Sequence, residues 1–464
     1  MILTNKNNKE GFEMKRKTTT LIMSAILAAA MAAGCGNAGE TAGSTGSQSE
    51  TTAGSTESQA KGESGAEETV LTFMAVGGSN EQAFTDVIKA AADKFNAKNE
   101  FNAKINLEWY ENEQYKTKLA TLMTQNDVTD IFFTWEAGYM KDYVESEKVY
   151  SLSDALKADP EWMERFNDGA FDAVTYNDKI YAVPMGQAII PIYYNTEIFA
   201  QNNLEVPKTW DEFVNVISTL KGAGVVPLSM ACQDAWVPAQ FMLELSGGVA
   251  GKELFEDIVN GKTTWDDPRY VETGKVFQEL VSLGAFPESF LGLAYDEGRT
   301  LFTSEKAAMY SMGTWDTSAV IEGMGGSDKI GVFMMPAKNP DYNDVHIASV
   351  EKLFAISEKC ENKEAALGFI KMLSDPEIQE KYVVDCGALS ATNTKIDTSK
   401  VDPVTAKIME LQGQVKKALT PMDRQFGANV GGEFNNISLA IAGGKDPQEQ
   451  FAALQNYAEQ EADQ

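Results

Sequence analysis

The sequence predicts an α/β protein whose folded part begins near Thr69. Apolar segments with the spacing of strands alternate with amphipathic helical segments from Val70 onward. This part runs for about 396 residues to Gln464, which is long enough for two domains or lobes. The segment before it, Gly36 to Glu68, has no Leu, Ile, Val or aromatic residue and cannot form a core.

The first predicted elements are a buried strand and a helix. Val70 to Val76 is a short apolar run that ends at two glycines, as a strand before a turn does. Ser79 and Gln82 have the spacing of a capping box, which predicts a helix start. Apolar residues then repeat on one helical face. They are Phe84, Val87, Ile88, Ala91 and Phe95.

The next segments continue the alternation. Ile105, Leu107 and Trp109 alternate as in a half-buried strand, and an apolar helical stripe follows them. The stripe consists of Tyr115, Leu119, Leu122 and Met123. Residues 130–134 predict a third strand. Strands that alternate with helices predict a parallel sheet covered by helices.

Ligands of such sheets bind beyond the carboxyl ends of the strands. The rule selects Asn80, after the first strand, and Trp135 and Glu136, after the third. We expect these residues to contact a ligand. The structural alternatives are helix capping for Asn80 and packing for Trp135.

Later segments follow the same alternation. Residues 179–184 and 189–194 are extended, and either Thr209 or Asp211 is expected to cap the helix that begins before Phe213. Trp236 lies between a loop and a helix, and Trp315 follows a strand-like run that ends in a glycine turn. Both tryptophans are therefore candidates for a binding surface.

The start of the chain resembles a secretion signal. Residues 14–17 are Met-Lys-Arg-Lys, and an apolar run from Leu21 to Ala33 follows them and stops before Cys35. About 13 apolar residues suit a signal peptide and are too few to span a bilayer. The pattern resembles a bacterial lipobox, with Cys35 as the lipid-bearing residue. The alternative is an ordinary signal peptide with an incidental cysteine.

These features predict how the amino-terminal part is organised. Residues 1–34 are expected to be an upstream extension plus a lipoprotein signal peptide that is removed, with Met14 as the preferred start. Residues 35–68 are expected to be a lipidated cysteine and a flexible Gly/Ser/Thr/Glu linker. Lipid on Cys35 would hold the folded part outside the cell membrane.

Composition argues against several classes of function. The net charge is −29 and no basic cluster stands out, which disfavours nucleic acid and anionic lipid as partners. His346 is the one histidine, which argues against histidine-based catalysis and histidine zinc sites. No metal or cofactor is expected. Cys360 and Cys386 either pair or, like Cys232, stay free.

Six segments in order give a specific resemblance, and they cover nearly all of residues 70–464. They are Asp130–Glu136, Ile180–Asn195, Pro207–Phe213, Phe302–Trp315, Phe354–Ala366 and Pro447–Phe451. The chain resembles the extracellular solute-binding proteins of bacterial ABC importers, in the carbohydrate-binding branch that is similar to maltose-binding protein.

The resemblance implies a two-lobed, type II periplasmic-binding-protein-like fold. Each lobe would hold a mostly parallel sheet flanked by helices. Residues 69–182 with 349–376 would form lobe 1, and residues 185–335 with 377–464 would form lobe 2. Residues 181–186 and 334–349 would be hinge crossings.

The resemblance also implies a monomeric, non-catalytic protein that captures a mono- or oligosaccharide between its lobes and delivers it to a membrane permease. Trp315 matches a position at which an aromatic residue stacks on sugar, and Trp135 and Trp236 are further candidates. The expected hydroxyl partners are Asn80, Glu136, Gln187, Asp316 and Arg424. The chain lacks the paired glycines common near Ser349, so contacts from Ser349 and Glu351 are not expected.

Two other readings stay open. A surface carbohydrate-active enzyme would need two carboxyl groups placed across a glycosidic bond, and no pair stands out in the sequence. A ligand sensor or adhesin would share the fold and the anchor. The ligand itself also stays open, because the family includes binders of polyamines, glycerol phosphates and metals.

Overall fold

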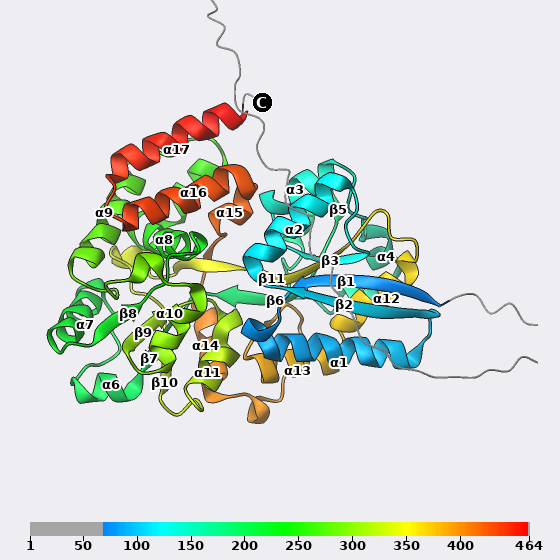
Figure 1. Ribbon diagram of the computed structural model, residues 1–464, viewed down its shortest axis with the longest axis horizontal. Coiled ribbons are helices and arrows are strands. Elements are labelled where there is room, and N and C mark those ends of the chain that lie inside the picture. The colour runs from blue at the N-terminus through cyan, green and yellow to red at the C-terminus, as the bar shows by residue number, and fades with distance from the viewer. Residues whose placement is uncertain (1–67, 463–464) are drawn as a thin grey trace, which may run out of the picture. The chain divides into compact units, whose positions relative to one another are not determined.

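Two β-sheets organise the folded part of the chain (Figure 1). The computed structural model describes residues 68–462, so Cys35 and the predicted signal peptide lie outside the described residues. The described residues belong to one compact unit.

The larger sheet has seven strands in the order β12-β6-β11-β3-β1-β2, with β13 paired to β11. Its strands are β1 (Thr69–Val76), β2 (Ala103–Tyr110), β3 (Ile131–Thr134), β6 (Val183–Ile189), β11 (Val345–Ile356), β12 (Leu389–Ser390) and β13 (Lys417–Leu419). β1 is parallel to both β2 and β3, whereas β11 is antiparallel to β3 and β6.

The smaller sheet has four strands in the order β10-β7-β9-β8. They are β7 (Ile192–Asn195), β8 (Val226–Ser229), β9 (Ala307–Ser311) and β10 (Ile330–Phe333). Only β8 and β9 are parallel in this sheet. A separate two-stranded sheet consists of β4 (Thr175–Tyr176) and β5 (Lys179–Ile180).

Both large sheets are therefore mixed, and the prediction that each is mostly parallel was wrong. Strand–helix–strand connections do give the expected parallel pairs of β1 with β2 and β3. β11 reaches the same sheet from a distant part of the chain and pairs antiparallel with β3 and β6. The local alternation of strands and helices carries no signal of that return.

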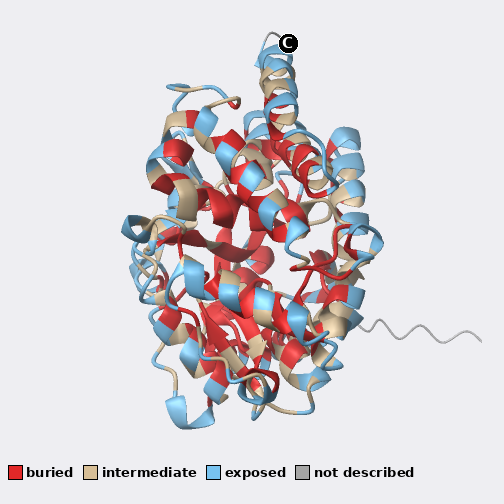
Figure 2. Ribbon diagram, turned by 90° about the vertical axis from the view of Figure 1, so that its left-hand side faces the viewer, coloured by how far each residue is buried: buried red, intermediate tan, exposed pale blue. Residues whose placement is uncertain are grey.

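Helices cover both sheets (Figure 2). They form two groups, and each group packs around one of two hydrophobic cores. The helices of the first core are α1 (Gln82–Lys98), α2 (Asn112–Gln125), α3 (Gly138–Glu145), α4 (Ser153–Ala158), α5 (Pro160–Met163), α12 (Lys363–Leu373) and α13 (Pro376–Cys386). In Figure 1, α1 and α13 lie on one side of strands β1 and β2, and α2 and α3 lie on the other.

The remaining helices pack around the second core. They are α6 (Thr196–Gln201), α7 (Trp210–Gly222), α8 (Trp236–Val259), α9 (Pro268–Ser282), α10 (Tyr295–Thr303), α11 (Thr317–Gly323), α14 (Pro403–Gln412), α15 (Met422–Gln425), α16 (Gly427–Ala442) and α17 (Pro447–Ala462). Among the helices of residues 68–462, none is both long and apolar enough to cross a bilayer.

Three adjacent strands lie where the chain passes from one core to the other. On β6, Met185 belongs to the first core and Ile189 to the second. On β11, Ile347 belongs to the second core and Val350 to the first. β12 begins at Leu389, in the second core. The predicted boundaries of the lobes stay a prediction.

Core membership bears on that prediction at one segment. Residues 377–388, expected in lobe 2, contribute Ile378, Tyr382 and Cys386 to the first core. The change of core in the third crossing strand therefore lies near Leu389 rather than at residue 376.

The expected local elements are present where the apolar pattern was strong. β1, β2 and β3 match the three predicted strands, and all five residues of the first helical stripe are buried in α1. Thr209 caps α7 in a capping box with Glu212. The capping box predicted at Ser79 was wrong, because Ser79 to Glu81 form a 3₁₀ helix without a side-chain cap.

Candidate functional site

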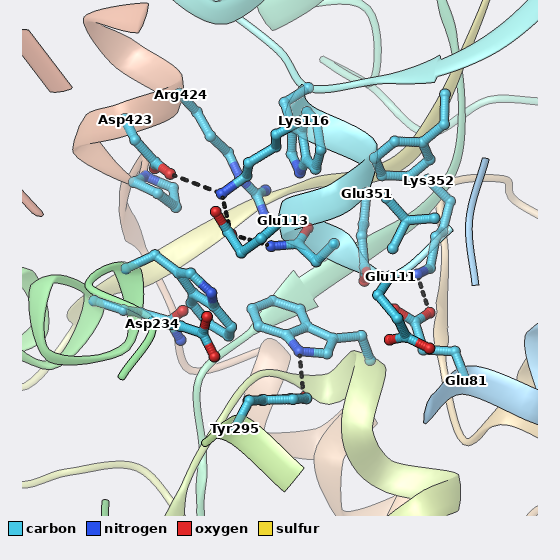
Figure 3. A pocket seen from close by; sticks show the side chains of 18 of the residues that line it. Glu81, Glu111, Glu113, Lys116, Asp234, Tyr295, Glu351, Lys352, Asp423 and Arg424 are labelled. Atoms are coloured by element: carbon cyan, nitrogen blue, oxygen red, sulfur yellow. Dashed lines mark hydrogen bonds and ion pairs between the residues drawn. The ribbon is translucent and has the colours of Figure 1, made fainter. Parts of the chain in front are cut away.

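A pocket of about 320 Å³ lies between elements of the two cores (Figure 3). The first core supplies the carboxyl ends of β1 and β3 and the start of α2, and the second supplies the starts of α8 and α10. β11 and α15 complete the wall. The volume is at the lower end of the range of about 300–1,000 Å³ that is usual for small-molecule sites.

Three aromatic side chains form one wall, and all three are only partly buried. The rings of Trp236 and Tyr295 lie 5.4 Å apart, and those of Trp236 and Trp315 lie 6.3 Å apart. The indole Nε1 of Trp315 donates a hydrogen bond to the Tyr295 hydroxyl at 3.2 Å. We call Trp236, Tyr295 and Trp315 the aromatic wall.

Gly313 allows the Trp315 ring to take this place. A Cβ atom on Gly313 would lie 2.2 Å from the ring of Trp315, closer than any two such atoms can approach. The glycine turn noted in the sequence thus lets the indole lie across the backbone and present itself to the pocket.

Trp135 lines the pocket but is mainly a packing residue. Its side chain is buried and makes edge-on ring contacts with Phe133 at 4.9 Å and Tyr139 at 4.7 Å. The ammonium of Lys116 lies 5.6 Å from its ring. Trp135 therefore lies where it could contact a ligand, but most of its side chain packs against other residues.

Glu136 and Arg424 form a buried ion pair at the pocket. An Nη1 donor of Arg424 lies 3.3 Å from Glu136 Oε1 and 3.0 Å from the Ser349 hydroxyl. Within the described residues, Glu136 Oε2 is buried without a hydrogen-bond partner. Burial raises the pKa of Glu136, and the charge of Arg424 only partly offsets this.

A second charged group lies where β11 faces α1. The Lys352 ammonium pairs with Glu81 and lies 3.5 Å from Glu351. Burial raises the pKa of Glu351 to about 7, and the positive charge of Lys352 opposes that rise. Lys352 has a φ of 53°, in the left-handed region that non-glycine residues rarely occupy and that often marks functional sites.

Six of the eight predicted contact residues line the pocket. They are Asn80, Trp135, Glu136, Trp236, Trp315 and Arg424. Asn80 donates a hydrogen bond to Glu111 at 2.7 Å and accepts one from Arg299 at 3.5 Å. No comparison tests their role in binding, which stays a prediction.

Gln187 and Asp316 do not line the pocket, which corrects the prediction of their place. Gln187 lies on β6, where its side chain accepts a hydrogen bond from Gln412 at 2.5 Å. Asp316 is buried and accepts hydrogen bonds from Arg299 at 2.6 Å and from the Tyr310 hydroxyl at 2.9 Å. Asp316 therefore supports the backbone next to Trp315.

The sequence reading missed several polar residues of the pocket. Glu111, Glu113 and Lys116 follow the end of β2, so the strand-end rule could have found them. Glu351 lines the pocket although no contact was expected from it. Asp234 and Tyr295 precede or begin helices and have no local signal.

Neither metal chemistry nor a disulfide is indicated by the described residues. Within residues 68–462, no three His, Cys, Asp or Glu side chains are placed to hold a metal ion. Cys232, Cys360 and Cys386 are free and buried, so the pairing of Cys360 with Cys386 that the sequence left open is not formed.

Two relatives that are named as sugar-binding proteins match about two thirds of the chain or more. The multiple sugar-binding protein of Streptococcus mutans is 25% identical over 66% of this chain and 73% of its own length. The maltotriose-binding protein of Pyrococcus abyssi is 23% identical over 71% of this chain and 69% of its own.

Solved structures share the fold. A structure described with xylan utilization by the thermophilic bacterium Caldanaerobius polysaccharolyticus has a TM-score of 0.78 and 28% identity over 83% of this chain and 99% of its own. A chitin oligosaccharide binding protein has a TM-score of 0.79 and 24% identity over 85% of this chain and 98% of its own. The predicted fold class, the type II periplasmic-binding-protein fold, is confirmed.

The family model for the bacterial extracellular solute-binding protein matches residues 77–380, which include the end of β3 and the aromatic wall of the pocket. This chain therefore belongs to the bacterial extracellular solute-binding proteins.

Proposed function

We propose that this protein captures a carbohydrate in the pocket and delivers it, chemically unchanged, to the permease of an ABC importer. The observation that carries the proposal is the aromatic wall of Trp236, Tyr295 and Trp315, which faces a pocket rich in carboxylates. The C–H faces of a sugar ring pack on indole, and its hydroxyls donate hydrogen bonds to carboxylate oxygens. The sugar-binding relatives support the same choice.

Binding without catalysis is part of the proposal. The family consists of solute-binding proteins, and the two buried pocket carboxylates are already engaged in ion pairs. Glu136 pairs with Arg424, and Glu351 lies near Lys352. A surface carbohydrate-active enzyme is the alternative, and incubation with glycans that bind would reveal it by the appearance of products.

The site and the anchor are proposed together. Asn80, Trp236 and Trp315 would contact the sugar, and lipid on Cys35 would hold a monomeric protein on the outer side of the cell membrane. Mass spectrometry of the purified protein tests whether Cys35 carries lipid. A Cys35→Ala variant should lose that lipid, and cell fractionation should then find the protein outside the membrane fraction.

A thermal-shift screen against mono- and oligosaccharides tests the proposed function. A ligand that binds only the native state raises the melting temperature, and the stabilisation grows with the logarithm of its concentration over Kd. At least one saccharide is expected to raise it, and cells that lack the protein are expected to lose uptake of that saccharide. A sensor or adhesin would bind without affecting uptake.

A further inference from the structure

Carboxylates beside the aromatic wall have no basic partner of their own. Asp234 and Asp296 line the pocket, next to Trp236 and Tyr295 in sequence. Among the ion pairs of the described residues, neither carboxylate lies within 4.0 Å of a lysine or arginine nitrogen. Burial raises the pKa of Asp234, and the nearby charges of Glu113 and Asp296 add to that rise, whereas a backbone hydrogen bond from Tyr295 and the charge of Lys116 oppose it.

Glu113 faces Asp234 from the opposite wall (Figure 3). Glu113 belongs to α2, which packs in the first core, and Asp234 precedes α8, which packs in the second. The Lys116 ammonium lies 3.0 Å from Glu113 and 4.0 Å from Asp423, so this single cation is shared among several carboxylates. Across the whole pocket, eight acidic residues face three basic ones.

The three rings of the aromatic wall pack on one another at an angle, and all three residues line the pocket. The plane of Trp236 is tilted by 49° to that of Tyr295 and by 59° to that of Trp315. Ring faces carry negative potential, so indole and phenol faces that converge attract a cation. Tilted rings with unpaired carboxylates beside them favour a positively charged group over a neutral one.

Glu136 gives an independent sign that the ligand is a hydrogen-bond donor. Its side chain is only 1% exposed, it lines the pocket, and its Oε2 atom has no partner among the described residues. A buried acceptor without a partner is unfavourable in the free protein, and a ligand N–H or O–H would satisfy it. Groups that donate, and above all charged donors, therefore match this end of the pocket.

We propose that the ligand is a saccharide that carries a protonated amino group, bound where Trp236, Tyr295 and Asp234 meet. This inference rests on the proposed function and makes it more specific. An ammonium there would give Asp234 the ion-pair counter-charge that no lysine or arginine of the described residues supplies, and it would lie against ring faces. Neutral hydroxyls would satisfy the acceptors but leave Asp234 without that counter-charge.

Three matched disaccharides test the inference by calorimetry on the purified full chain. A β-1,4-linked glucosamine dimer, its N-acetylated form and cellobiose differ only in the group at carbon 2. At a pH where the amine is protonated, the amino dimer is expected to bind about tenfold more tightly than either neutral form. Added salt is expected to reduce that advantage.

An Asp234→Asn variant tests the assigned residue. The substitution keeps the shape and an acceptor oxygen but removes the charge, so the preference for the amino dimer should disappear while the affinity for cellobiose stays within about twofold. Asp328→Asn is the matched control, because this exposed aspartate lies outside the pocket. It should leave the preference unchanged.

The outcomes separate this inference from the function on which it rests. If cellobiose or the acetylated dimer binds as tightly as the amino dimer or more tightly, the proposed requirement for an amino group is wrong, but the proposed binding of carbohydrate is retained. Tight binding of spermidine with no saccharide bound overturns the carbohydrate as well. If the preference for the amino dimer survives in Asp234→Asn, the assignment of Asp234 as its counter-charge is wrong. If the amino dimer does not bind at all, the whole inference is wrong.

Discussion

Arg424 and Glu136, which are 288 positions apart in the chain, form a buried ion pair at the edge of the pocket. Glu136 follows β3 of the larger sheet, and Arg424 belongs to α15, whose Met422 packs in the second core. The pair therefore joins the two packing regions at the point where the ligand is proposed to bind.

Removal of one partner from this pair should be costly. Arg424→Met is expected to leave the Glu136 carboxylate buried without its counter-charge and to lower the free energy of unfolding by roughly 3 kcal/mol. Adding Glu136→Gln to the same chain should recover part of the loss, because a neutral amide is cheaper to bury. Urea unfolding of the two variants measures this, and equal stability of both would contradict the role of the pair.

Trp315 should matter for binding much more than for folding. Trp315→Ala removes a partly exposed ring from the aromatic wall and is expected to cost about 2 kcal/mol of binding, near thirtyfold in Kd. Calorimetry with a saccharide identified in the screen measures the loss. Trp210→Ala is the control, since Trp210 is a partly buried tryptophan outside the pocket and should leave Kd unchanged.

Gly313 should control affinity without touching the ligand. In Gly313→Ala the new methyl group would meet the Trp315 ring, so the ring must move and the affinity should fall severalfold. Gly292→Ala is the matched control, because a Cβ at Gly292 would meet open space. Intrinsic tryptophan fluorescence with and without ligand would report the displaced ring, and an unchanged Kd in Gly313→Ala would contradict this account.

His346 should make stability depend on pH. Burial alone would lower its pKa, but the Glu244 carboxylate 2.5 Å away outweighs burial and raises the pKa above 6.5. A group whose pKa is higher in the folded state stabilises fully below its unfolded pKa and loses that contribution as pH rises through its folded pKa. The free energy of unfolding should therefore fall as the pH rises above 6.5.

A His346→Gln variant provides the comparison for that pH profile. Glu351 contributes with the same sign in a lower window, between 4.5 and about 7, because its raised pKa makes ionisation in the folded state unfavourable. The part of the slope above pH 6.5 that belongs to His346 should be missing in His346→Gln. A slope there that is the same in both proteins would assign it to other groups.

Sequence patterns predicted local structure well where burial follows a regular period. The stripe from Phe84 to Phe95 is buried as expected because helical spacing alone decides which side chains face a core. The cap predicted at Ser79 was wrong, because Ser79 lies inside a 3₁₀ helix that has no side-chain cap. The antiparallel entry of β11 is a tertiary event.

The site was predicted in the parts that follow strands and glycine turns. Trp315 and Glu136 lie at such positions and do line the pocket, whereas Gln187 and Asp316 bind other side chains instead. Asp234 has no motif, since it reaches the pocket through the packing of α8 against the second core. Which residues meet across the pocket depends on the tertiary fold, so the local sequence does not predict it.

The central claim is that this chain binds a saccharide reversibly and leaves it unaltered. Calorimetry of the purified full chain with the saccharide found in the thermal-shift screen, followed by recovery of that saccharide, tests it directly. The account predicts one bound molecule per chain and complete recovery of the original ligand. Appearance of a cleaved or modified product, or a protein that binds no saccharide of the panel, would contradict it.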